Sequence, residues 1–228
     1  MSTPNPKEIA GRRAAEFVED DMTVGLGTGS TVHFTLVRLA ERVRDERLRI
    51  RGVPTSIDTE RKAREWGIPL TTLDDTATID LTIDGADEID DAFQMVKGGG
   101  GALLREKVVA SISRREVIVV GPEKLVKKLG STFPLPIEVV PFAHATVERR
   151  LRTLGALPTL RTREGRTYTT DNGNLILDCR FEHGIADPHA LESDLARIPG
   201  LVESGLFIDL AHILVIGHPT GECHVRKK

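Results

Sequence analysis

This sequence has few cysteines and no long apolar run. Its 228 residues include two cysteines, Cys179 and Cys223, which lie far apart and form no CxxC pair. Two such cysteines give no disulfide framework and are typical of a protein in a reducing cytosol. No stretch approaches the roughly 18 apolar residues of a membrane-spanning helix, and the first residues contain no apolar segment of a signal peptide. We therefore expect a cytoplasmic protein with no membrane partner.

An excess of positive charge is also missing. Lysine and arginine number 31 against 34 aspartates and glutamates, which gives a formal net charge of −3. Nucleic-acid-binding domains usually carry a strongly basic surface, so we expect no nucleic-acid partner. His218, Cys223 and His224 cluster near the tail, but their spacing matches no standard zinc pattern, so we expect no metal there.

Apolar strand patterns alternate with amphipathic helix patterns over the first half of the chain. The alternation predicts βαβ units and a largely parallel sheet. Two of the strands run into a glycine followed by a helix, as at the ligand-binding edge of many α/β sheets. Strands are expected at 22–27, 48–53, 79–85 and 116–121, and helices at 5–18, 30–45, 58–67, 102–113 and 122–130.

The regular alternation of strand and helix patterns ends at `STFPLP`, where two prolines within three residues are typical of a linker. The following order, β-α-β-β-α-β, predicts a ferredoxin-like unit. The apolar segment 206–217 can return to the first sheet, which makes the second unit an insertion. We predict an α/β fold with two domains: a Rossmann-like, mostly parallel sheet domain of residues 1–131 and 206–228, and an inserted ferredoxin-like α+β domain of residues 132–205.

A glycine-rich loop, `GLGTGST` at residues 25–31, joins the first strand to the second helix. We call it the first glycine loop. Exposed amides at a helix start, with small hydroxyl side chains, favour a phosphate. A dinucleotide fingerprint fails because Ser30 stands where the third glycine belongs and the second strand has no acidic residue at its end. A Walker A loop fails because no GK[ST] follows, and a merely tight turn remains open.

The stretch `DGADEID` combines strong charge with the end of a predicted strand. Asp84 and Asp87 lie where the sheet is expected to open to a ligand, so both are candidate functional residues. For Glu88, Asp90 and Asp91 we expect carboxylates that start a helix or face solvent.

A second glycine-rich segment, `KGGGGA`, follows closely. We call residues 98–101 the second glycine loop. Its amides have no Cβ to block approach, and Lys97 adds a cation beside them, so together they can stabilise an oxyanion. Glu106 lies in the next helix, where its carboxylate can face back over this loop, although a surface ion pair with Arg105 or Lys107 is the alternative.

These groups have complementary chemical tasks. Carboxylates move protons, while a lysine and bare amides hold the negative charge that appears when a proton leaves carbon. The first glycine loop can hold a phosphate away from the reacting end. The combination predicts proton abstraction next to a carbonyl.

The motifs `GLGTGST`, `DGADEID`, `KGGGGALLREK` and `FPLPIEV` occur in this order. With this order and spacing, the sequence resembles ribose-5-phosphate isomerase of the A type over essentially the whole chain. The resemblance implies interconversion of D-ribose 5-phosphate and D-ribulose 5-phosphate in the non-oxidative pentose phosphate pathway, without a metal or an organic cofactor. It also implies a homodimer. Gly101 is a small departure, since many relatives carry alanine there, and we expect little effect from it.

The resemblance also implies roles for individual residues. Glu106 would be the base that shuttles a proton between C1 and C2, Asp84 would assist opening of the furanose ring, and Asp87 would bind substrate hydroxyls or support that step. Stabilisation of the cis-enediolate would fall to Lys97 with the amides of Gly98, Gly99 and Gly100. The other substrate-binding residues implied by the match are Lys7, Thr28, Gly29, Ser30, Thr31, Gly85, Ala86 and Lys124.

Other functions remain open on the sequence. The same fold serves as the effector domain of some sugar-responsive bacterial repressors, so a non-catalytic sugar-phosphate sensor is the main alternative. The presence of Asp84, Asp87, Lys97 and Glu106, and the lack of a helix-turn-helix pattern before residue 7, count against it. A CoA-transferase relative would need a nucleotide site, for which the chain is short. Isomerisation of another aldose phosphate remains open as a side activity.

Overall fold

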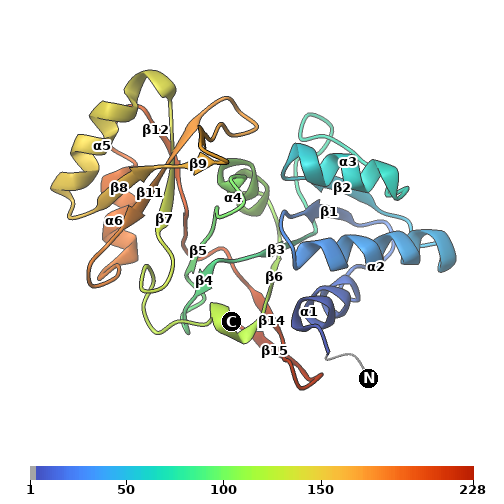
Figure 1. Cartoon of the computed structure of the whole chain (residues 1–228). Coiled ribbons are helices and arrows are strands. Elements are labelled where there is room, and N and C mark those ends of the chain that lie inside the picture. The colour runs from blue at the N-terminus through green and yellow to red at the C-terminus, as the bar shows by residue number, and fades with distance from the viewer. Residues whose placement is uncertain (1–3) are drawn as a thin grey trace. The chain divides into compact units, whose positions relative to one another are not determined.

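The computed structural model describes residues 4–228, which form two compact units, each with its own hydrophobic core (Figure 1). The first unit contains the described residues up to Ala86 together with Arg105–Lys124 and Leu210–Lys228. The second unit contains Asp87–Leu104 and Leu125–Asp209.

A six-stranded sheet forms the centre of the first unit, with the strand order β15-β14-β6-β3-β1-β2. All neighbouring strands are parallel except β15, which is antiparallel to β14. The mostly parallel sheet is confirmed, and the apolar segment near the C-terminus supplies β14 as expected. The strands are β1 (Thr23–Leu26), β2 (Arg51–Pro54), β3 (Leu81–Gly85), β6 (Glu116–Val120), β14 (Ile213–Gly217) and β15 (Cys223–Lys227).

The helices form where capping and periodicity predict them: α1 (Pro6–Ala15), α2 (Val32–Asp45), α3 (Ile57–Glu65) and α4 (Leu103–Ser111). The Asn5 side chain caps α1 by accepting from the Lys7 amide at 3.1 Å. Helix α1 packs closely on the start of α2. The two backbones are so near at Gly11 that an added Cβ would lie 2.6 Å from the Thr31 carbonyl oxygen. Within residues 4–228, no helix has the length and apolar character needed to cross a membrane.

The second unit contains a four-stranded antiparallel sheet with the order β12-β7-β11-β8. Its strands are β7 (Leu135–Val139), β8 (Leu157–Leu160), β11 (Leu175–Arg180) and β12 (Leu201–Ser204). Helices α5 (His144–Thr153) and α6 (Pro188–Leu195) lie on the same side of this sheet (Figure 1). The β-α-β-β-α-β order and this strand arrangement confirm the ferredoxin-like prediction.

Two smaller strand groups complete the second unit. A three-stranded sheet has the order β13-β5-β4, and a hairpin pairs β9 with β10. The strands are β4 (Glu88–Ile89), β5 (Met95–Val96), β9 (Thr162–Arg163), β10 (Arg166–Thr167) and β13 (Leu206–Phe207).

The helix expected at 122–130 is wrong. Only the short 3-10 helix η1 (Pro122–Lys124) forms, and the chain then runs beside β4. The Val126 amide donates to the Ile89 carbonyl at 2.9 Å, and the Leu129 carbonyl accepts from Ile185 at 2.7 Å. These backbone groups bond to other segments instead of bonding along a helix, so tertiary pairing overrides the local helix pattern.

The expectation for Glu88 is also wrong. Glu88 neither starts a helix nor faces solvent, because it is fully buried in β4. Its carboxylate accepts hydrogen bonds of 2.5–2.8 Å from the amides of Gly130, Thr132 and Phe133 and from the Thr132 hydroxyl. Asp91 is exposed as expected. A single carboxylate therefore fixes the conformation of the segment 130–133.

Replacing Glu88 with alanine should destabilise the protein, because the variant removes the acceptor for four hydrogen bonds. An unpaired donor costs roughly 1–3 kcal/mol, and water can replace part of this loss in a half-exposed segment. We expect the free energy of unfolding, measured by urea titration, to fall by about 2–4 kcal/mol. Glu182→Ala, at an exposed glutamate of the same unit, is the matched control and should change it by less than about 0.5 kcal/mol. Equal effects of the two substitutions would contradict the assigned role of Glu88.

Candidate active site

The first glycine loop is held by Asp84 within the first unit. Asp84 is fully buried near the end of β3, and its Oδ1 accepts from the Thr28 amide at 3.1 Å and the Gly85 amide at 2.7 Å. A Cβ at Gly27 would collide with the same carboxylate. A glycine is required there because the backbone approaches the acid so closely.

Hydroxyl groups surround Thr28 on its other side. The Thr28 Oγ1 lies 2.9 Å from Thr55 Oγ1, 2.8 Å from Ser56 Oγ and 3.2 Å from Thr59 Oγ1. Thr59 in turn donates to the Gly27 carbonyl at 2.9 Å. The motif analysis missed these three residues, although the hydroxyl-rich segment after β2 was a readable signal for them.

Lys7 and Ser30 meet at the start of two helices. The Lys7 Nζ donates to Ser30 Oγ at 2.9 Å, and both residues are exposed. Gly29 has a φ of +126°, a conformation that residues with a Cβ rarely adopt. The loop therefore presents a lysine, hydroxyls and backbone amides together, which is a combination suited to an anion.

The parallel strands bring the other predicted residues of this unit toward one edge. β1, β3 and β6 are parallel, so their carboxyl ends lie along the same side of the sheet. Gly85 ends β3 and Ala86 follows it, while Lys124 ends η1 just after β6. Glu106 lies in α4 with 5% of its surface exposed. Its burial argues against the alternative of a surface ion pair.

The second glycine loop is held by Asp87 within the second unit. The Asp87 Oδ2 accepts from the Gly99 amide at 2.7 Å. Lys97 precedes the loop and is 2% exposed, and its Nζ lies 5.2 Å from the centre of the Phe207 ring. The loop carbonyls accept from Arg161 and Tyr168, residues that no motif had indicated.

The predicted site residues thus form two groups, one in each unit. Asp87, Lys97, Gly98, Gly99 and Gly100 belong to the second unit. The first unit contains Lys7, Thr28, Gly29, Ser30, Thr31, Asp84, Gly85, Ala86, Glu106 and Lys124.

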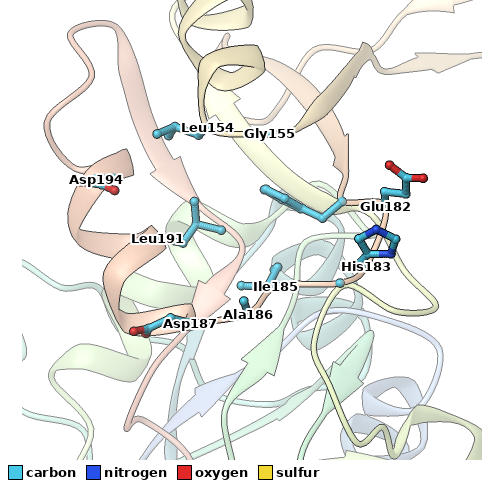
Figure 2. Close-up of a pocket in the computed structure, with 11 residues that line it drawn as sticks. Leu154, Gly155, Glu182, His183, Ile185, Ala186, Asp187, Leu191 and Asp194 are labelled. Atoms are coloured by element: carbon cyan, nitrogen blue, oxygen red, sulfur yellow. The ribbon is translucent and has the colours of Figure 1, made fainter.

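A separate pocket of about 430 Å³ lies in the second unit and contains none of the predicted residues (Figure 2). Apolar side chains such as Leu154, Ile185 and Leu191 line it, together with the acidic Asp187 and Asp194. The Asp187 carboxylate caps α6 by accepting from the Ala190 amide at 3.0 Å, so it serves the helix.

Among residues 4–228, the cysteines and the side chains that commonly bind metals give no second candidate centre. Burial raises the pKa of the Cys179 and Cys223 thiols, so neither is activated as a nucleophile. In the part of the chain that the structure describes, no three His, Cys, Asp or Glu side chains are grouped to hold a metal ion.

Comparison with known proteins gives a consistent result. The family described as Ribose 5-phosphate isomerase A (phosphoriboisomerase A) matches residues 51–221. The chain is 52% identical to Ribose-5-phosphate isomerase A of Listeria innocua serovar 6a over 225 residues, covering 98% of this chain and 99% of that protein.

Solved structures agree with the sequence match. Ribose 5-phosphate isomerase from Plasmodium falciparum has a TM-score of 0.94 at 38% identity, with 97% of each chain covered. A D-ribose-5-phosphate isomerase in complex with phospho-erythronic acid has a TM-score of 0.94 at 37% identity, with 99% of this chain and 100% of that chain covered. The chain belongs to the ribose 5-phosphate isomerase A family.

Proposed function

We propose that this chain interconverts D-ribose 5-phosphate and D-ribulose 5-phosphate through a cis-enediolate, in the non-oxidative pentose phosphate pathway. The observation that carries the proposal is the full-length similarity to isomerases, one of which binds phospho-erythronic acid. That ligand joins a phosphate to a carboxylate, an anion that resembles the charged oxygens of an enediolate. The comparisons support a catalytic isomerase over a non-catalytic sugar-phosphate sensor.

Glu106 is proposed as the base. It removes the proton from C2 of the open-chain aldehyde, the C–H electrons form the C1=C2 double bond, and the carbonyl electrons move to O1. Return of the proton to C1, with transfer of the O2 proton to O1, gives the ketone. The burial of Glu106 supports this role, since a base shielded from water keeps the proton for return to carbon.

Lys97 and the second glycine loop are proposed to stabilise the enediolate. Lys97 is almost fully buried, and hydrogen-bond donors stabilise developing charge best where water is excluded. Because the Gly99 amide already donates to Asp87, the Gly100 amide is the better placed partner for an oxyanion. The Gly98 amide remains a third proposed donor.

The two aspartates are proposed to act through their second oxygens. The Asp84 Oδ1 already accepts two backbone amides, so we assign the proton transfer that opens the furanose ring to Oδ2. By the same reasoning, Asp87 uses Oδ2 to hold Gly99 and Oδ1 to bind a substrate hydroxyl.

The first glycine loop is proposed as the phosphate site. The contact between Lys7 and Ser30 places a cation beside the amides at the start of α2, where an anion is favoured. The further substrate contacts proposed here are Thr28, Gly29, Thr31, Gly85, Ala86 and Lys124.

The working state is proposed to be a cytoplasmic homodimer. The family resemblance supports it, and symmetric dimers are the commonest state of soluble oligomers. Light scattering should give a mass about twice the 25.0 kDa of one chain. A mass of one chain at working enzyme concentration would contradict the dimer.

Glu106→Gln should abolish isomerisation without unfolding the protein, because glutamine keeps the size of the side chain but cannot accept the proton. We expect kcat for ribose 5-phosphate, followed by NMR on chelator-treated protein, to fall by at least about 10³-fold. Glu8→Gln, which makes the same change at an exposed residue of α1, should leave kcat unchanged. Conversion unaffected by Glu106→Gln would keep the isomerase but refute this base.

Lys7→Ala should weaken substrate binding more than it slows the chemistry, because the phosphate does not react. We expect KM for ribose 5-phosphate to rise about tenfold, while kcat changes by less than about threefold. Arg13→Ala removes a positive charge from the same helix and should leave both constants unchanged. Equal changes in KM for the two variants would indicate general electrostatic attraction and not a phosphate contact.

A further inference from the structure

One arginine binds two carbonyl groups of the second glycine loop. The Arg161 Nη1 donates to the Gly98 carbonyl at 2.8 Å and to the Gly99 carbonyl at 3.3 Å. Its Nε and Nη2 bind the two carboxylate oxygens of Asp178 at 2.9 and 2.5 Å. The side chains of Arg161 and Asp178 are only 11% and 23% exposed, so this pair is largely shielded from water.

This arginine has a rigid support. Arg161 follows β8, and its amide donates to the Ile176 carbonyl of β11 at 2.8 Å. Asp178 also belongs to β11, so the ferredoxin-like sheet carries both partners. A planar guanidinium held by two oxygens has a fixed direction, which a lysine in its place would lack.

Tyr168 extends the same arrangement to the next residue of the loop. Its hydroxyl donates to the Gly100 carbonyl at 3.3 Å, and its ring lies 5.9 Å from the Arg161 guanidinium. A Cβ at Gly101 would collide with the tyrosine ring and hydroxyl. The carbonyls of Gly98, Gly99 and Gly100 therefore all face Arg161 and Tyr168.

The direction of the carbonyls fixes the direction of the amides. In a planar trans peptide the N–H points opposite to the C=O. The Gly98 carbonyl binds Arg161 while the Gly99 amide of the same peptide donates to Asp87. The Gly99 carbonyl also binds Arg161, so the Gly100 amide points away from the arginine. Among the described residues, the Gly100 amide has no acceptor.

We propose that Arg161, oriented by Asp178, is a positioning residue that fixes the peptide groups of the second glycine loop so that the Gly100 amide points toward the developing oxyanion of the substrate. Arg161 does not touch the substrate in this role. It sets the direction of the peptide groups before the charge forms, which is the condition under which such donors accelerate a reaction. The inference rests on the proposed isomerase function.

The test compares Arg161→Gln with Arg163→Gln. Arg163 also packs on Tyr168, with its guanidinium 4.5 Å from the ring centre, but the side chains that donate to the loop carbonyls within residues 4–228 are those of Arg161 and Tyr168. We expect Arg161→Gln to lower kcat for ribose 5-phosphate by about 10–100-fold and to change KM by less than about threefold. The affinity for phospho-erythronic acid should fall about tenfold or more, while inhibition by inorganic phosphate should stay unchanged. Arg163→Gln should stay within about twofold of the wild type in all four measurements.

Three further variants extend the test, and the first two, Arg161→Lys and Asp178→Asn, keep it decisive if Arg161→Gln folds poorly. Arg161→Lys retains the positive charge but loses the planar set of donors of the guanidinium. We therefore expect its kcat to lie between those of the wild type and Arg161→Gln. Asp178→Asn should lower kcat, and the double variant Arg161→Gln/Asp178→Asn should be no slower than Arg161→Gln alone, since Asp178 acts through the arginine.

Three outcomes would overturn the proposal: equal kcat for Arg161→Gln and Arg163→Gln, additive losses in the double variant, or a parallel loss of phosphate affinity and kcat. The last would indicate a general structural role. Failure of the proposed function is distinguishable from these, because the wild-type protein itself would then not convert ribose 5-phosphate.

Discussion

The candidate site depends on hydrogen bonds that backbone amides donate to carboxylates. Asp84 holds the first glycine loop, Asp87 holds the second, and Glu88 holds the segment 130–133. The `DGADE` motif is therefore a set of anchors for three backbone segments, two of them rich in glycine, and its aspartates are also the groups proposed to transfer protons or bind substrate. Glycine is needed where the backbone comes closest to a carboxylate, since a Cβ at Gly27 would collide with Asp84 and one at Gly99 would collide with Asp87.

Because one carboxylate oxygen of Asp84 and of Asp87 is used by a backbone amide, the two oxygens of each aspartate have different tasks. One oxygen orients a loop, and the other is assigned to the substrate. On the opposite side of the second glycine loop, Arg161 and Tyr168 hold the carbonyls, so its peptide groups are fixed at both ends. Donors that are fixed in advance need not turn during a reaction, so a glycine segment held in this way is suited to the proposed stabilisation of negative charge.

Much of the fold could be predicted from the sequence, and the predictions that were wrong have physical causes. The parallel sheet and the ferredoxin-like unit follow from local periodicity, which is a short-range property. The helix expected at 122–130 failed because its backbone pairs with distant segments. Glu88 was misjudged for the same reason, since its partners lie more than 40 residues away in the sequence. Arg161 is an ordinary arginine in an arginine-rich stretch, and only the folded sheet brings it to the glycine carbonyls.

The most direct test of the account is to record the amide resonances of Gly99 and Gly100 while adding phospho-erythronic acid or inorganic phosphate. We expect phospho-erythronic acid to shift the Gly100 resonance strongly, because its carboxylate occupies the oxyanion position, and inorganic phosphate to leave this resonance in place. Equal shifts with inorganic phosphate, or no shift with phospho-erythronic acid at saturation, would contradict the assignment of the second glycine loop to the enediolate.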